Sequence, residues 1–83
     1  MHDDVGFRVP REVEDRWYDG DRLEGVDFYI NDAVLVTYGA HSGEVGAVIS
    51  LLRLKPEPEY LVVLGSGTGD IRVLQSKLRR LPT

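Results

Sequence analysis

The feature that most limits the fold is a strand, a glycine-rich loop and a second strand between Asp32 and Leu54. Apolar residues recur along positions 33–38 and again along 44–54, a pattern typical of β-strands. Three glycines connect these runs, Gly39, Gly43 and Gly46. Glycine readily takes the positive φ that a tight connection between antiparallel strands requires. The stretch therefore predicts a β-hairpin.

Shorter apolar runs extend the strand pattern to the end of the chain. They predict three further strands, over residues 60–64, 71–74 and 79–81. The connections are predicted to be a proline turn, a glycine-rich hairpin loop and a 3₁₀ turn, over residues 55–59, 65–70 and 75–78. Four or five short strands with tight connections favour a small barrel, because closing a sheet removes its exposed edges. We expect an all-β, five-stranded barrel over residues 32–83.

Residues 1–31 read as an acidic extension that precedes the barrel. They hold nine acids and four bases, a net charge of −5, whereas residues 32–83 carry a net charge of +1. The extension predicts a short strand, one or two helical turns and a second strand, over Val5–Pro10, Pro10–Tyr18 and Val26–Ile30. Five of the seven aromatic residues lie in it. So many aromatic side chains argue against simple disorder, so we expect the extension to dock on the barrel or on a partner.

Length and composition set the class of protein. With 83 residues and no cysteine, the chain has room for one domain with a small core and no disulfide to reinforce it. No apolar run is long enough to span a membrane, and the acidic start Met1-His2-Asp3-Asp4 is unlike a signal peptide. We expect a complete bacterial protein in the cytoplasm, with its oligomeric state left open.

The hairpin resembles a known family motif. Asp32, Val34 and Val36, followed by Gly39 and the spacing Gly43-x-x-Gly46-x-Val48-x-x-Leu51, are similar to the KOW motif. The match covers about 20 residues, and in KOW proteins this element begins a five-stranded SH3-like barrel. The family includes transcription factors and ribosomal proteins, so the resemblance implies a protein-binding or nucleic-acid-binding module. KOW loops are often basic, whereas residues 39–46 of this chain contain no Lys or Arg.

The first functional hypothesis is a non-catalytic module that binds another protein, as an accessory or regulatory factor in transcription, translation or a multi-subunit complex. It rests on the KOW-like spacing and on the acidic balance of the chain. The candidate contact residues are those of the glycine loop, the adjacent barrel rim and the extension: Trp17, Tyr18, Tyr38, His41, Ser42 and Glu44. For Trp17 and Tyr18 the sequence leaves two roles open, covering the barrel or contacting the partner.

The second hypothesis is an RNA-binding KOW domain that uses a basic face. Its candidate residues are the Lys and Arg of the second half of the chain: Arg53, Lys55, Arg72, Lys77, Arg79 and Arg80. The net charge of −4 disfavours it, because neutralisation of phosphates by Lys and Arg supplies most of the affinity for nucleic acids. A solvated surface, or a dock for the acidic extension, is the simpler interpretation of these residues.

We expect no enzymatic activity, no cofactor and no metal. The run Tyr60 to Asp70 looks like the first motif of S-adenosylmethionine-dependent methyltransferases, with glycines at 65, 67 and 69. That fold needs a helix and a further strand with an acidic residue, and only 13 residues follow Asp70. The neighbours His41, Ser42 and Glu44 suggest a triad, but consecutive residues rarely converge as nucleophile, base and orienting group. Two histidines and no cysteine cannot supply a four-ligand zinc site.

Overall fold

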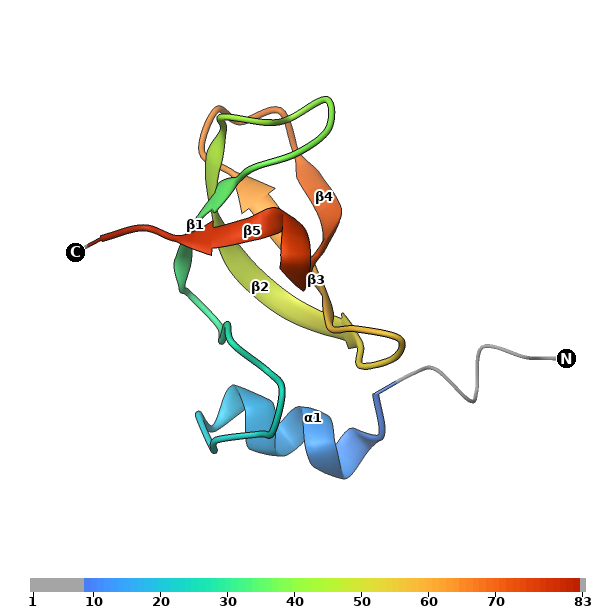
Figure 1. Ribbon diagram of the computed structural model, residues 1–83. Coiled ribbons are helices and arrows are strands. Elements are labelled where there is room, and N and C mark those ends of the chain that lie inside the picture. Colours follow the sequence, from blue (N-terminus) through green and yellow to red (C-terminus); the bar gives the residue numbers. More distant parts are fainter. Residues whose placement is uncertain (1–8, 83) are drawn as a thin grey trace, which may run out of the picture.

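Five antiparallel strands form a single sheet in the computed structural model, which describes residues 9–82 (Figure 1). The strands are β1 (Ala33–Val36), β2 (Val45–Arg53), β3 (Glu59–Leu64), β4 (Asp70–Leu74) and β5 (Leu78–Arg80), in the spatial order β4-β3-β2-β1-β5. Helix α1 (Arg11–Tyr18) precedes them, and the 3₁₀ turn η2 (Gln75–Lys77) links β4 to β5. This is the all-β, five-stranded SH3-like fold that the sequence predicts.

The long strand β2 pairs with two neighbouring strands. Its first half pairs with β1, as in Ala33 opposite Ala47, and it pairs with β3 along most of its length. Two register irregularities interrupt the β2–β3 ladder, and such bulges bend a strand and increase its twist. Gly46 on β2 pairs with Leu64 of β3, and a Cβ on it would collide with the Val63 carbonyl oxygen and lie 2.8 Å from Val62 Cγ1. Glycine is therefore required at this position.

The hydrophobic core includes residues from the amino-terminal extension as well as from the barrel. The buried hydrophobic residues in the described chain are Trp17, Val26, Phe28, Val34, Val36, Val48, Leu51, Tyr60, Val62, Leu64, Val73 and Leu78. Alternation along β1 and β3 places every second side chain in this core, as period-two patterning requires. The core thus continues from the barrel interior to residues 17–28.

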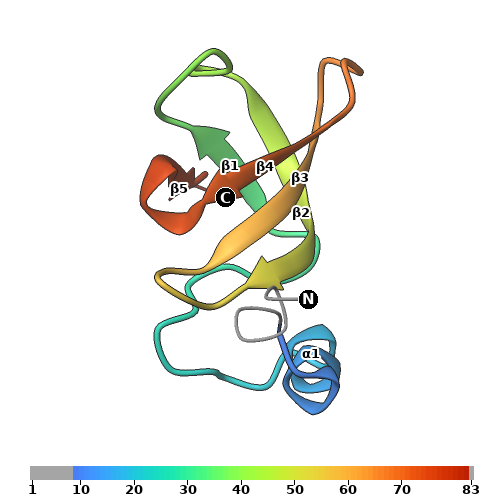
Figure 2. The same cartoon turned by 90° about the vertical axis from the view of Figure 1, so that its right-hand side faces the viewer.

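Helix α1 covers the end of the barrel opposite the two hairpin loops (Figures 1 and 2). Pro10 precedes its first turn, which carries Glu12 and Glu14, as is favourable at a helix N-terminus. Trp17 is completely buried, and its indole N–H donates to the Phe28 carbonyl oxygen at 2.9 Å. The Trp17 ring also stacks on Tyr29, with 6.0 Å between ring centroids. Of its two predicted roles, Trp17 therefore covers the barrel and presents no surface to a partner.

The strand predicted over Val26–Ile30 is wrong, because this segment is irregular. Three of its backbone N–H groups, those of Asp27, Phe28 and Tyr29, bond to side chains instead of to a neighbouring strand. The Asp27 N–H donates to Gln75 Oε1 at 2.9 Å, and the Tyr29 N–H donates to Asp32 Oδ2 at 2.7 Å. The segment still buries Val26 and Phe28, so its apolar content reflects core packing and not a ladder.

The remaining sequence predictions concern the start of the chain and membrane insertion. Residues 5–8 of the predicted strand Val5–Pro10 lie outside the described residues, and Val9 and Pro10 are in no strand. The helix predicted over Pro10–Tyr18 is confirmed, with Pro10 as its cap. Within residues 9–82, the only α-helix is far too short to cross a membrane.

Candidate functional site

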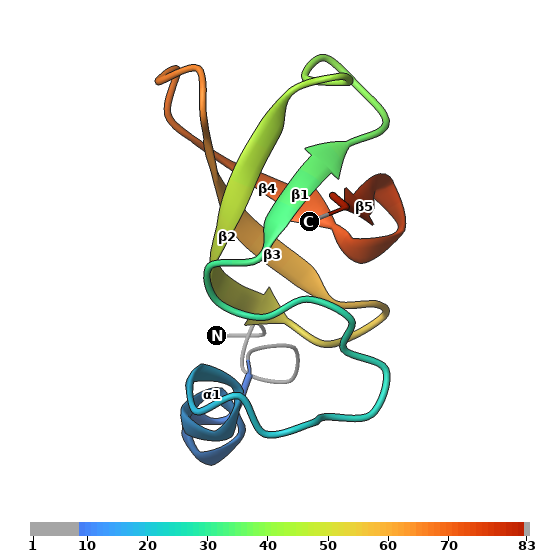
Figure 3. The same ribbon diagram turned by 90° about the vertical axis from the view of Figure 1, so that its left-hand side faces the viewer.

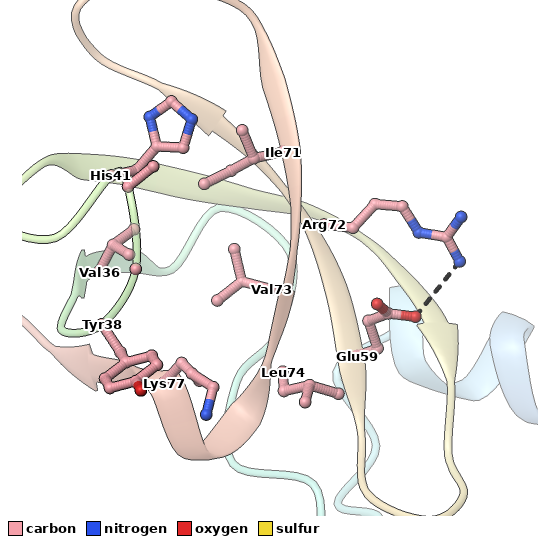
Figure 4. A pocket seen from close by; sticks show the side chains of 11 residues that line it. Val36, Tyr38, His41, Glu59, Ile71, Arg72, Val73, Leu74 and Lys77 are labelled. Carbon is pink, nitrogen blue, oxygen red and sulfur yellow. Dashed lines mark hydrogen bonds and ion pairs between the residues drawn. The ribbon is translucent and has the colours of Figure 1, made fainter.

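A groove of about 380 Å³ lies between the β1–β2 loop, β4 and η2 (Figure 4). Its lining residues come from three separate parts of the chain: Val36, Tyr38, Gly39, Ala40, His41, Glu59, Ile71, Arg72, Val73, Leu74 and Lys77. Ile71 and Val73 point into it from β4, whereas the Arg72 side chain leads away toward Glu59 (Figure 4). The groove thus has an apolar floor and a polar rim, which is the usual character of a binding site.

Tyr38 is the most exposed large hydrophobic residue in the described chain, at 67%. It lies two residues after the end of β1 and stands at one wall of the groove. Lys77 Nζ lies 4.4 Å from the centroid of its ring, a cation–π geometry. The Thr37 N–H also donates to the Lys77 carbonyl oxygen at 2.9 Å. These contacts hold an aromatic ring and an ammonium group together at the mouth of the groove.

His41 lies on the same wall of the groove as Tyr38, across from β4, and is oriented by Glu44 (Figure 4). His41 Nδ1 lies 3.0 Å from Glu44 Oε2, and Ser66 Oγ donates to Glu44 Oε1 at 3.0 Å. The hydrogen bond with His41, followed by that from Ser66, lowers the pKa of the Glu44 carboxyl below its ordinary value. Glu44 therefore ties the β1–β2 loop to the β3–β4 loop and fixes the position of His41 (Figure 3 shows the two loops at one end of the barrel).

The arrangement of His41, Glu44 and Ser66 does not match a nucleophilic triad. In a triad the hydroxyl bonds to the imidazole, which in turn bonds to the carboxylate. Here the Ser66 hydroxyl and the His41 imidazole both bond to the carboxylate. Ser42, the hydroxyl considered from the sequence, is exposed beside this cluster. No group of three or more metal-ligating side chains occurs in the part of the chain that the structure describes.

Four of the six predicted partner contacts lie at or beside the groove. Tyr38 and His41 line it, Ser42 is exposed next to His41, and Glu44 orients His41. The remaining two residues, in α1, are at the other end of the barrel (Figure 1). Tyr18 is 42% exposed there, and its hydroxyl lies 3.4 Å from the Ile49 carbonyl oxygen.

The predicted basic face is divided among several sites. Arg53 and Arg72 both contact Glu59 Oε1, at 3.5 and 3.3 Å. Arg80 pairs with Asp32 at 3.2 Å and also donates to the Asp27 carbonyl oxygen.

The other three basic residues add little to a shared surface. Lys77 contacts Tyr38 at the groove. Lys55 follows β2 in an exposed turn, and Arg79 is exposed on β5. Half of the six candidate residues are thus paired with carboxylates inside the chain, which leaves less positive charge for phosphates than the sequence count suggests.

The groove also uses residues that the sequence did not point to. Ile71, Val73 and Leu74 read as ordinary strand residues, and only the return of β4 past the β1–β2 loop brings them opposite Tyr38. Gln75 is a second case, because its carboxamide bonds to Tyr60, Asp27 and Gly25. Neither role can be predicted from the local sequence pattern.

Comparison with known proteins finds no relative of this chain. No family model matches the chain, and searches of curated proteins and of solved structures give no significant match. Any inference about function therefore rests on the groove and its surroundings.

Proposed function

We propose that this protein is a non-catalytic interaction module whose groove binds another protein. The observation that carries this proposal is the exposed Tyr38 ring, held by Lys77 beside an apolar floor in the groove that His41 also lines. Exposed aromatic residues at the edge of an apolar depression are characteristic of sites where a few residues supply most of the binding energy. The KOW-like spacing of the hairpin suggests a partner in transcription, translation or a multi-subunit complex.

Two observations favour a protein over RNA as the partner. The chain carries a net charge of −4, and three of the six basic candidates are engaged by Glu59 or Asp32. An RNA-binding surface would need those charges free to neutralise phosphates. Among Phe, Tyr and Trp, only Tyr38 lines the groove in the described chain, whereas single-stranded nucleic acids are usually held on several stacked rings.

Site-specific photocrosslinking tests the proposal. A benzophenone side chain replaces Tyr38 in one variant and Val63 in a control, since Val63 is 37% exposed on β3 and does not line the groove. After irradiation in cells, we expect position 38 to give a discrete protein adduct that position 63 does not give. His41→Glu in the Tyr38 variant should weaken that adduct. Crosslinks to RNA alone, or identical products at both positions, would contradict the proposal.

A further inference from the structure

The outer edge of β4, which has no neighbouring strand in the sheet, belongs to a strand that lines the groove. Strand β4 pairs with β3 on one side and ends the spatial order of the sheet. The Leu64 N–H donates to the Gly69 carbonyl oxygen at 3.0 Å, and the Gln75 N–H donates to the Pro58 carbonyl oxygen at 2.8 Å. These two bonds fix which residues of β4 bond to β3, because hydrogen-bonded and non-hydrogen-bonded pairs alternate along an antiparallel ladder.

The alternation directs the N–H and C=O of Arg72 away from β3. The pair between Leu61 and Arg72 falls on the non-hydrogen-bonded positions of the ladder. Within residues 9–82, none of the backbone hydrogen bonds outside the ladders involves the Arg72 N–H or C=O. Since the Arg72 side chain leads away to Glu59 (Figure 4), the main chain is what Arg72 presents to the groove.

We propose that the groove binds an extended segment of the partner protein, which adds as a sixth strand on the outer edge of β4. This inference rests on the proposed function and specifies the form of the ligand. Main-chain hydrogen bonds to the free edge would supply affinity, and alternate side chains of the segment would supply specificity. Strands pair about 4.8 Å apart, so a segment beside β4 runs between that strand and Tyr38 and His41 on the opposite wall.

The chemistry of the groove defines the segment that it accepts. Side chains on one face of the added strand meet Val36, Ile71 and Val73, so that face is apolar. The rim carries Lys77 and His41, and its carboxylate, Glu59, is already paired with two arginines. Charge complementarity therefore selects a segment with a carboxylate near Lys77.

A second copy of this chain is a poorer occupant of the same edge. Antiparallel pairing of two β4 strands about their centres sets Arg72 opposite its own counterpart. Like charges directly opposite each other destabilise a sheet. A short segment of a different protein has no such conflict.

The test uses the full-length chain and a library of twelve-residue linear peptides displayed on phage. The tightest binder is then made as a synthetic peptide, and its affinity is measured for three versions of the protein. Arg72→Pro deletes the outward N–H at a position where an edge strand tolerates proline. Arg72→Ala loses the same ion pair with Glu59 and keeps the N–H. We expect Arg72→Ala to bind within about threefold of the natural chain and Arg72→Pro to bind at least about tenfold more weakly.

Other outcomes separate this inference from the proposed function. Equal affinities for Arg72→Pro and Arg72→Ala, with Tyr38→Ala unable to bind, would leave the groove as a site and overturn strand addition. If no peptide is selected but a protein adduct still forms at position 38, the groove also remains a binding site and strand addition is overturned. Loss of both peptide binding and the adduct would remove the proposed function as well. Dimerisation that Arg72→Pro abolishes would identify a second copy as the occupant and overturn the proposal of a different partner.

A peptide-side measurement covers the case in which Arg72→Pro does not fold. Methylation of each backbone nitrogen of the synthetic peptide, one at a time, removes one donor without changing the protein. Strand addition predicts that sensitive and insensitive nitrogens alternate along the peptide, because only every second residue faces β4. A uniform response along the peptide would contradict it.

Discussion

The phenol of Tyr60 donates a 2.6 Å hydrogen bond to the carboxamide oxygen of Gln75, and this pair joins the barrel to the amino-terminal extension. The same oxygen accepts from the Asp27 N–H at 2.9 Å, and the Gln75 amide nitrogen donates to the Gly25 carbonyl oxygen at 3.0 Å. One side chain at the start of η2 therefore satisfies polar groups of β3 and of the irregular segment that follows α1.

Replacement of Gln75 should destabilise the fold although the residue is only half-buried. Gln75→Ala removes three hydrogen bonds at once and leaves the buried Tyr60 hydroxyl without its acceptor. We expect a loss of about 1–3 kcal/mol in the free energy of unfolding, measured by urea denaturation. Ser76→Ala is the matched control, because it deletes one exposed bond to Glu57 in the same turn. Equal effects of the two substitutions would contradict a special role for Gln75.

Trp17 should contribute far more to stability than its neighbour Tyr18. The Trp17 side chain is completely buried, whereas Tyr18 is 42% exposed. We expect Trp17→Ala to cost about 3–5 kcal/mol and Tyr18→Ala about 1 kcal/mol or less. Circular dichroism during thermal unfolding measures both variants without relying on tryptophan fluorescence. A Trp17→Ala protein as stable as Tyr18→Ala would show that α1 does not pack on the barrel in solution.

Gly46 and Gly65 provide a paired test of the close packing between β2 and β3 at position 46. A Cβ at Gly46 collides with backbone and side-chain atoms of β3, whereas a Cβ at Gly65 meets the Val45 carbonyl oxygen at 3.4 Å, an ordinary contact. We expect Gly46→Ala to lower the free energy of unfolding by about 1–3 kcal/mol and Gly65→Ala to change it by less than about 0.5 kcal/mol. Chemical denaturation of the two variants distinguishes these cases, and similar midpoints would argue against close packing at position 46.

Tyr60 should make the protein sensitive to alkaline pH. Burial raises the pKa of Tyr60 to about 12 from an ordinary value of 10. Between these values the folded protein binds a proton that the unfolded chain has released, so stability falls as pH rises. The contribution is fully present below pH 10 and is lost as pH rises toward 12. Absorbance at alkaline pH should show one of the four tyrosines ionising late, and Tyr60→Phe should remove that late step. Four tyrosines that ionise together would contradict the burial of Tyr60.

Most of the strand pattern follows from local sequence. Alternation along β1, the apolar run of β3 and the glycines around residues 39 and 67 predict the strands and hairpin loops to within about two residues, because these signals come from backbone conformation and period-two burial. The strand predicted over Val26–Ile30 is wrong because a strand and a packed irregular segment can have the same run of apolar residues. Only the distant side chains of Tyr60 and Gln75 decide between them.

The candidate site was predictable in part. Tyr38 and His41 stood out because an aromatic residue and a histidine border a glycine loop. The floor of the groove and the place of Lys77 beside Tyr38 depend on the return of β4 and η2, more than thirty residues later. Likewise, the basic residues form a cluster in the sequence, whereas their pairing with Glu59 and Asp32 depends on the sheet register.

Because Trp17 is buried in the shared core, residues 32–83 without the amino-terminal extension would lack part of that core. A gene rearrangement that carried only residues 32–83 would leave behind three core side chains, Trp17, Val26 and Phe28. The fully buried Tyr60 ring would lose the edge-on contact with Phe28 and face water. A deletion meant to remove the acidic charge would therefore also create an apolar surface, and any gain in RNA binding could not be attributed to charge. Substitution of the exposed acids, with the aromatic residues kept, separates the two effects.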